Sequence, residues 1–197
     1  MKYLTRAHWG ARPPIKTKPI GHNLKGVVIH YAGFNIDIDR DPAQIAESIQ
    51  KQHMVGRGWW DIAYSEMVAL DGTVVEGRGL LVRSGANGTN AGNKDFLAIC
   101  LLIGPDQTPS PEMIQSVKER IKVIRHFQPN ATSIVGHRDC KATDCPGEHA
   151  YALVRNGSFQ PDSPEIVMSD PTLDEQIADL FARVNKLEEK VCVCVPA

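Results

Sequence analysis

The segment FLAICLLIG, residues 96–104, most limits how this chain can fold, because it is apolar on both faces of an extended strand. Such a strand needs cover on both sides, so we expect it at the centre of a sheet flanked by helices. A β-branched run, GVVIHY at 26–31, predicts a second buried strand with His30 near its end. The stretch YSEMVALDGTVVEG predicts a hairpin that turns at Asp71-Gly72.

Two helices are predicted from the residues at their N-termini. Asp41 followed by Pro42, and Ser110 followed by Pro111, are typical of a capped helix start with proline in the first turn. The second helix carries an apolar stripe at helical spacing, formed by Ile114, Val117, Ile121 and Ile124. Strands and helices intermixed around one central strand predict a single α/β domain, residues 1–156, with one mixed β-sheet flanked by helices.

The C-terminal part has a different character. Residues 157–171 are rich in Pro, Ser and Asp, and we interpret them as a linker. Residues 172–197 are predicted to form a short coiled-coil helix that makes a parallel homodimer. The heptad seam consists of Leu173, Ile177, Leu180, Val184, Leu187 and Val191. Phe181 widens the seam and favours the alternative, a helix docked on its own domain. Cys192 and Cys194 follow, and interchain disulfides there are a hypothesis.

Composition excludes several classes of function. The net charge is −1, and because residues 161–190 are strongly acidic, the rest of the chain is mildly basic. It has no Lys/Arg stripe of the kind that nucleic-acid binding requires, so we expect no nucleic-acid partner. No apolar run approaches the ~20 residues that span a bilayer, so we expect no membrane insertion. Five unevenly spaced cysteines do not resemble a disulfide framework.

A metal site is suggested by SIVGHRDCKATDCPGEHA, residues 133–150, a Gly- and Asp-rich stretch expected to be a loop. Catalytic zinc takes three ligands from His, Cys or carboxylate and keeps one position open for water. Spacing favours His137 and Cys145 only modestly, because Cys140 and His149 are alternative ligands. His30, at the end of a buried strand, is the best-placed third ligand.

Four motifs in the same order resemble one family. They are GVVIH ending at His30, HMVGRGWWDIAY at 53–64, DGTVVEGRG at 71–79 and GHRDCKATDCPG at 136–147. The chain is similar to the zinc-dependent N-acetylmuramoyl-L-alanine amidases, a fold shared by animal peptidoglycan recognition proteins and a small phage amidase. The resemblance covers roughly residues 5–155. It implies that Zn²⁺ is the cofactor, with His30, His137 and Cys145 as ligands.

The resemblance also implies roles for other side chains. Tyr64 and Thr143 match positions near the reacting carbonyl and are candidate catalytic residues. Four positions match the substrate cleft: His53, Trp59, Arg78 and Asn93. Strand alternation predicts that Glu66 shares a face with Tyr64, which makes it a second, weaker candidate for proton transfer. Relatives often carry Gly-Ala-His where this chain has Gly85-Ala86-Asn87, a departure at a substrate contact.

The expected function is cleavage of the amide bond between N-acetylmuramic acid and L-alanine of bacterial peptidoglycan by a zinc-activated water. The chain shows no signal peptide, so we expect synthesis in the cytoplasm and action on the cell wall after release, as in phage-type host lysis. One alternative is a recognition module that binds peptidoglycan without cutting it. Another is a purely structural zinc with a fourth ligand, Cys140 or His149.

Overall fold

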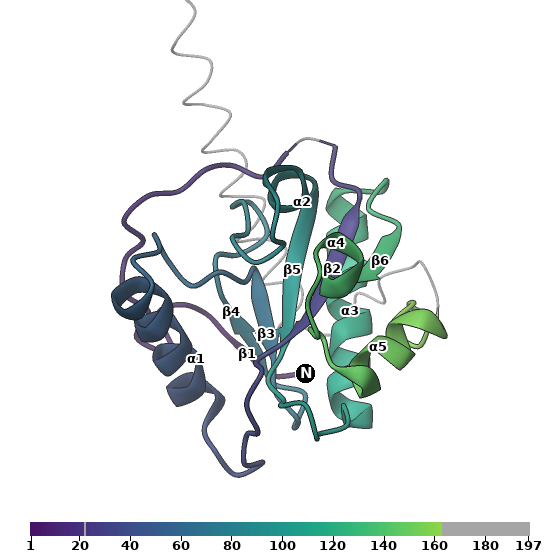
Figure 1. Cartoon of the computed structure of the whole chain (residues 1–197), viewed down its shortest axis with the longest axis horizontal. Coiled ribbons are helices and arrows are strands. Elements are labelled where there is room, and N and C mark those ends of the chain that lie inside the picture. Colours follow the sequence, from purple (N-terminus) through teal and green to yellow (C-terminus); the bar gives the residue numbers. More distant parts are fainter. Residues whose placement is uncertain (22, 163–197) are drawn as a thin grey trace, which may run out of the picture. The chain divides into compact units, whose positions relative to one another are not determined.

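The computed structural model describes residues 1–21 and 23–162, and Figure 1 shows strands and helices intermixed as expected. The strands are β1 (Tyr3–Leu4), β2 (Gly26–Tyr31), β3 (Glu66–Val68), β4 (Val74–Glu76), β5 (Phe96–Leu101) and β6 (Ser133–Gly136). The helices are α1 (Pro42–Lys51), the π-helical turn η1 (Gln52–Gly56), α2 (Asn90–Asp95), α3 (Pro111–Phe127), α4 (His137–Cys140) and α5 (Glu148–Arg155).

The six strands form one mixed sheet in the order β1-β4-β3-β5-β2-β6. Strands β3 and β4 pair antiparallel as the predicted hairpin, and the remaining neighbours are parallel. Strand β5 lies between β3 and β2, so the prediction that the apolar segment is central is confirmed. Because β2 and β6 are parallel, their carboxyl ends lie at the same edge of the sheet.

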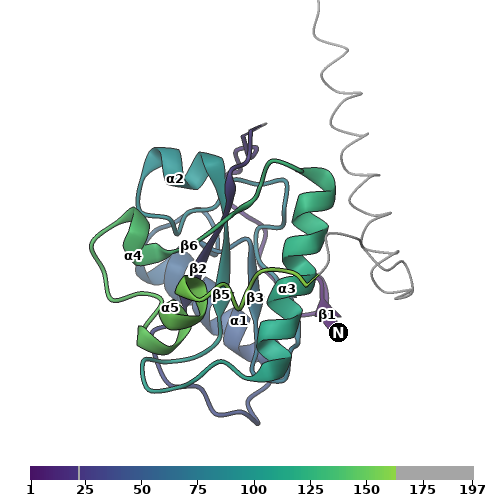
Figure 2. The same ribbon diagram turned by 90° about the vertical axis from the view of Figure 1, so that its right-hand side faces the viewer.

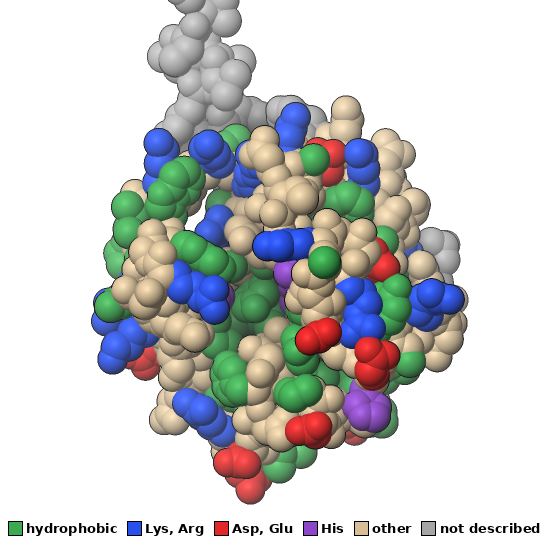
Figure 3. Space-filling view, in the orientation of Figure 1, with side chains coloured by type: hydrophobic (Ala, Val, Ile, Leu, Met, Phe, Trp, Pro, Cys, Tyr) green, Lys and Arg blue, Asp and Glu red, His purple; other side chains and the backbone are tan. Residues whose placement is uncertain are grey.

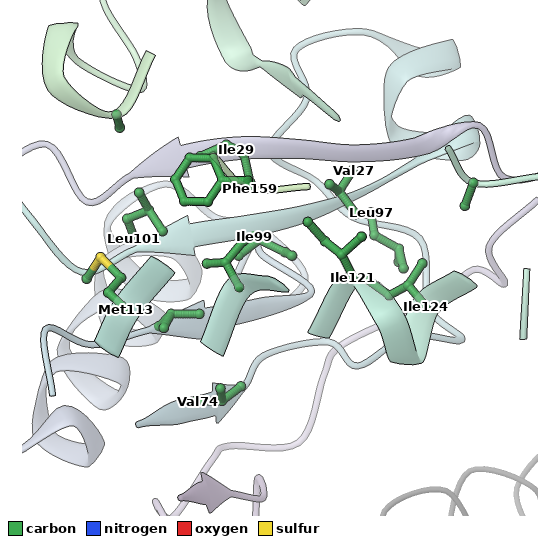
Figure 4. Packing of buried hydrophobic residues seen from close by; sticks show 14 of the residues in the cluster. Val27, Ile29, Val74, Leu97, Ile99, Leu101, Met113, Ile121, Ile124 and Phe159 are labelled. Atoms are coloured by element: carbon green, nitrogen blue, oxygen red, sulfur yellow. The ribbon is translucent and has the colours of Figure 1, made fainter. Parts of the chain in front are cut away.

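One face of the sheet is covered by α3 and α5. Figure 4 shows side chains of β2 and β5 packed against Met113, Ile121 and Ile124 of α3 and against Phe159. Figure 2 shows α3 running along this side of the sheet. The apolar stripe predicted for this helix is therefore its buried face, and the helix starts where Ser110 accepts a hydrogen bond from Met113 N at 3.0 Å.

The opposite face is only partly covered by a helix. Ile45, Ala46 and Ile49 of α1 pack with Met67 and Val75 of the hairpin strands. No residue of β2 belongs to this second apolar cluster within the described part of the chain. Near its carboxyl end β2 presents His30 on this face, because alternation along the strand points Ile29 into the first cluster. The uncovered part of this face is where the site lies.

The compact body continues beyond the predicted boundary at residue 156. Phe159, in the segment interpreted as a linker, is 0% exposed and packs in the first cluster. Asp162 pairs with Lys118 of α3 at 2.7 Å. The body therefore extends at least to residue 162. The predicted helix at 172–197, its heptad seam and Cys192 and Cys194 lie outside the described residues. Within the described residues, no helix combines the length and apolar character needed to span a membrane.

Candidate metal centre and substrate cavity

Two histidines meet where neighbouring parallel strands end. In the register of β2 and β6, Ile29 lies opposite Gly136, so His30, near the end of β2, and His137, which directly follows β6, lie side by side. Their ring centroids are 4.5 Å apart. The loop expected here begins instead as one helical turn, because the Asp139 carboxylate accepts a hydrogen bond from Gly136 N at 2.7 Å and closes that turn.

Cys145 reaches the same point because the chain after α4 folds back on itself. Arg138 N donates to the Cys145 carbonyl at 3.0 Å, and the Arg138 guanidinium donates to Asp144 O at 2.6 Å. These bonds bring the Cys145 sulfur to 3.4 Å from Tyr31 N, which donates to it, and to 3.6 Å from His30 Nδ1. The end of β2 and this short folded loop thus bring together His30 and Cys145, which are 115 residues apart in the sequence.

The three predicted ligands therefore form one cluster, in which the candidate ligand atoms of His30, His137 and Cys145 all lie within 4.8 Å of one another. His137 Nε2 is buried and has no hydrogen-bond partner among the described residues. Two imidazoles and one sulfur suit zinc, and a buried ring nitrogen without a partner in the protein suits a metal ligand. Cys140 and His149, the alternative ligands, are not part of the cluster.

Burial controls protonation at this cluster. It lowers the pKa of His30 to about 3, with a further contribution from His137, so the imidazole is neutral and has a lone pair for a cation. Burial raises the pKa of the Cys145 thiol to about 11, against the smaller lowering effects of Tyr31 N–H and Arg138. A bound cation would therefore have to displace the thiol proton, as metal ions do when they bind cysteine.

The two predicted catalytic residues flank the cluster. The Tyr64 ring lies 5.5 Å from that of His30, and burial, followed by the neighbouring Cys100 and Cys145, raises the Tyr64 pKa well above its usual value. The hydroxyl is therefore a hydrogen-bond donor at neutral pH. Thr143 is exposed, and its hydroxyl accepts a hydrogen bond from Cys145 N at 3.3 Å. Its own hydrogen remains available to a ligand.

The expectation for Glu66 is wrong. Its side chain is 0% exposed and points to the α3 side of the sheet, where Arg120 donates to both carboxylate oxygens at 2.7 and 3.0 Å. Tyr64 packs against the second apolar cluster, on the other face of the sheet. Alternation fails between these two residues because β3 begins only at Glu66, so Tyr64 precedes the strand. Glu66 is a buried structural acid, out of reach of the site.

Three of the four predicted substrate residues line one cavity of about 310 Å³: Trp59, Arg78 and Asn93. Arg78 is fixed by its own hydrogen bonds to Ile62 O at 2.6 Å and Arg83 O at 2.9 Å. Figure 3 shows the face of the molecule hollowed beside α1, with histidine side chains inside and Lys and Arg side chains around the rim. The cavity and the metal cluster are thus built on the face that the helices leave open.

His53, the fourth predicted substrate residue, does not line that cavity. It lies in η1, is 6% exposed, and accepts a hydrogen bond from Ala63 N at 3.1 Å. Its ring lies 4.8 Å from that of Trp59 and 5.7 Å from that of Tyr64. His53 is therefore a buried residue that packs against Trp59 and Tyr64.

Sequence reasoning missed several residues of the cavity wall, among them Lys18, Trp60 and Arg83. Trp60 is 38% exposed, and the Lys18 ammonium lies 5.5 Å from its ring centroid. The adjacency of two tryptophans was a usable signal for Trp60, because tryptophan is enriched at binding surfaces. Lys18 and Arg83 come from distant segments and carry no local signal.

The family model described as N-acetylmuramoyl-L-alanine amidase matches residues 20–148, which include all three residues of the cluster. This chain belongs to the N-acetylmuramoyl-L-alanine amidase family. The predicted family resemblance is confirmed.

Relatives of this amidase-family chain are animal recognition proteins. It is 31% identical over 159 residues to Peptidoglycan-recognition protein SC1a of Drosophila melanogaster, a match that covers 79% of this chain and 85% of the fly protein. It is 28% identical over 155 residues to Peptidoglycan recognition protein 1 of Mus musculus, with 77% and 85% covered.

Solved structures agree with the sequence relatives. The fold matches Drosophila PGRP-LB with a TM-score of 0.72 at 26% identity, covering 82% of this chain and 99% of that one. It matches peptidoglycan recognition protein-LE, solved in complex with tracheal cytotoxin, a monomeric diaminopimelic acid-type peptidoglycan, with a TM-score of 0.71 at 25% identity. That match covers 78% of this chain and 92% of the recognition protein.

Proposed function

We propose that the protein is a zinc-dependent hydrolase that cleaves the amide bond between N-acetylmuramic acid and L-alanine in bacterial peptidoglycan. The observation that carries this proposal is the cluster of His30, His137 and Cys145, whose candidate ligand atoms lie within 4.8 Å of one another on the hollowed face. A cluster of three ligands leaves the fourth zinc position free for water, which distinguishes a catalytic from a structural site.

Bound zinc would supply a water of lowered pKa and would polarise the substrate carbonyl. The chain's own residues prepare this chemistry. His30 is held neutral by burial, and the Cys145 sulfur already accepts a hydrogen bond from Tyr31 N. Neutrality leaves a lone pair on His30 for a cation, and the hydrogen bond fixes the position of the Cys145 sulfur, so little reorganisation is needed on binding.

Two hydroxyls would then act on the reacting amide. The Tyr64 hydroxyl is kept protonated by burial and can donate a hydrogen bond, and its ring lies 5.5 Å from that of His30. The Thr143 hydroxyl has a free hydrogen that can stabilise negative charge on the carbonyl oxygen, although less strongly than a lysine would. Trp59 and Arg78 line the adjoining cavity, where an aromatic face and a fixed guanidinium suit a glycopeptide with sugar and carboxylate groups.

A recognition module that binds without cutting is the second candidate, and the relatives, which are named as recognition proteins, favour it. The complete set of three ligand side chains favours catalysis, because binding alone does not require a buried sulfur beside two imidazoles. The setting of phage-type host lysis and the release to the cell wall both stay predictions.

Mass spectrometry of digested, purified peptidoglycan tests the proposal. We expect newly freed N-terminal L-alanine and intact glycan, with cleavage abolished by a zinc chelator and restored by Zn²⁺. Cys145→Ser should lose both zinc and cleavage, whereas the matched control Cys140→Ser should keep both. Wild-type protein that binds the polymer and carries zinc yet releases no L-alanine would instead establish the recognition role.

A further inference from the structure

Asn87 contacts His30 without belonging to the metal cluster. Its side chain is 0% exposed, and its Oδ1 lies 2.9 Å from His30 Nε2. The other ring nitrogen, His30 Nδ1, lies 3.6 Å from the Cys145 sulfur. One ring nitrogen of His30 therefore contacts Asn87, and the other lies beside the Cys145 sulfur.

The surroundings of Asn87 decide which way its amide points. Asn87 Nδ2 lies 2.9 Å from Gly92 O and 3.0 Å from Phe96 O. Backbone carbonyls only accept hydrogen bonds, so the atom that faces them must be the NH₂ group. The carbonyl oxygen of the amide is then the atom that faces His30. Because that oxygen accepts only, the hydrogen between the two residues must belong to His30 Nε2.

This fixes the form of the imidazole. A neutral histidine carries one ring hydrogen, so a hydrogen on Nε2 leaves the lone pair on Nδ1, the nitrogen nearest to Cys145. The segment that presents Asn87 is itself held in place: Asn87 N donates to Asn93 Oδ1 at 2.8 Å, and Thr89 caps α2 through Gly92 N at 2.9 Å. Asn93, predicted from the resemblance as a substrate contact, thus uses its carbonyl oxygen inside this network.

We infer that Asn87 is a positioning residue, which holds His30 in the Nε2–H form with Nδ1 directed at the metal cluster. The consequence for metal affinity depends on the proposed zinc site, whereas the imidazole form in the metal-free protein does not. Asn87 is also the position at which this chain departs from Gly-Ala-His, and its side chain is buried.

Two measurements test the inference. Long-range ¹⁵N–¹H correlation spectra of the metal-free wild-type protein, with histidine labelled, should show His30 protonated on Nε2 alone. Competition against a chromophoric chelator should then show that Asn87→Ala weakens zinc binding about tenfold or more, the usual effect of losing such a partner. Asn130→Ala removes an exposed asparagine side chain from the loop before β6, outside this network, and its zinc affinity should stay unchanged.

The outcomes separate the two ideas. An Asn87→Ala protein that binds zinc like wild type, or a wild-type His30 protonated on Nδ1, would overturn the role of Asn87 and leave the amidase proposal intact. A wild-type protein without zinc affinity would sink the amidase proposal and the affinity effect together. If Asn87→Ala does not fold, the wild-type spectrum alone decides between the two forms of His30.

Discussion

At the scale of single residues, the site is held together before any cation binds. The Cys145 sulfur accepts a hydrogen bond from a strand backbone, and His30 meets a buried amide. Only His137 Nε2 is left without a partner in the described part of the cluster. Ligand atoms that are already aimed at one point lose little conformational entropy on binding, which favours tight metal binding.

Tyr64→Phe should lower the turnover number by about a hundredfold, because it removes one hydroxyl donor beside the reacting group. Zinc content and peptidoglycan binding should be unchanged, since the ring remains. Steady-state kinetics on a soluble muropeptide, with metal analysis of the same samples, measures both. An undiminished turnover number would remove Tyr64 from the mechanism.

His53 gives the protein acid sensitivity. Burial, with Arg57 and Arg78 nearby, lowers its pKa to about 4, below the ~6.5 of an unfolded chain. Between those pH values His53 is protonated in the unfolded state but neutral in the folded state. The free energy of unfolding therefore falls as the pH drops from about 6.5 to 4. In metal-free protein, His53→Asn should lessen this loss, as measured by denaturant unfolding across that range. The asparagine oxygen can still accept from Ala63 N.

At the scale of elements, local signals predicted most of what the structure shows. The caps at Asp41 and Ser110 set two helix starts, and the apolar run at 96–104 marked the central strand. The Glu66 prediction failed because where a strand begins depends on pairing with distant residues, here β5. The Asn87 contact was equally hidden, since it joins residues 57 positions apart. Register, rather than local pattern, also brings His30 and His137 together.

Helix α3 offers a comparison of two ion pairs. Arg120→Met should destabilise the protein by about 3–5 kcal/mol, because it leaves the Glu66 carboxylate buried and unpaired. Asp162→Asn, which removes the exposed partner of Lys118 on the same helix, should have a much smaller effect. Urea unfolding of both variants measures the difference. Equal effects would mean that the buried pair is not needed for stability.

At the scale of the whole molecule, the described residues belong to one compact unit, with the site on the face of the sheet that α1 covers only in part. A chain ending at residue 164 should fold with full stability. A chain ending at 156 loses Phe159 from the core and should be less stable by about 3–5 kcal/mol. Thermal unfolding of the two truncated chains compares them, and equal melting temperatures would place the boundary at 156 after all.

The homodimer through residues 172–197 stays a prediction. If the heptad seam pairs two chains, deleting this segment should convert a dimer to a monomer and weaken binding to intact cell wall through lost avidity. Turnover of a small soluble muropeptide should be spared. Analytical ultracentrifugation and wall co-sedimentation measure the two effects. A full-length monomer would rule out the dimer, and reducing against non-reducing electrophoresis reports on Cys192 and Cys194.

The sheet order has a mechanical consequence. Strand β6 is the last in the sheet, and among the described strands it pairs with β2 alone. A zinc ion bound by both His30 and His137 would link this edge strand to β2 at the carboxyl ends of the two strands. Amide hydrogens of residues 133–136 should therefore exchange faster after chelation, while those of central β5 keep their rates. Loss of the metal would then increase local unfolding of the edge strand as well as abolish activity.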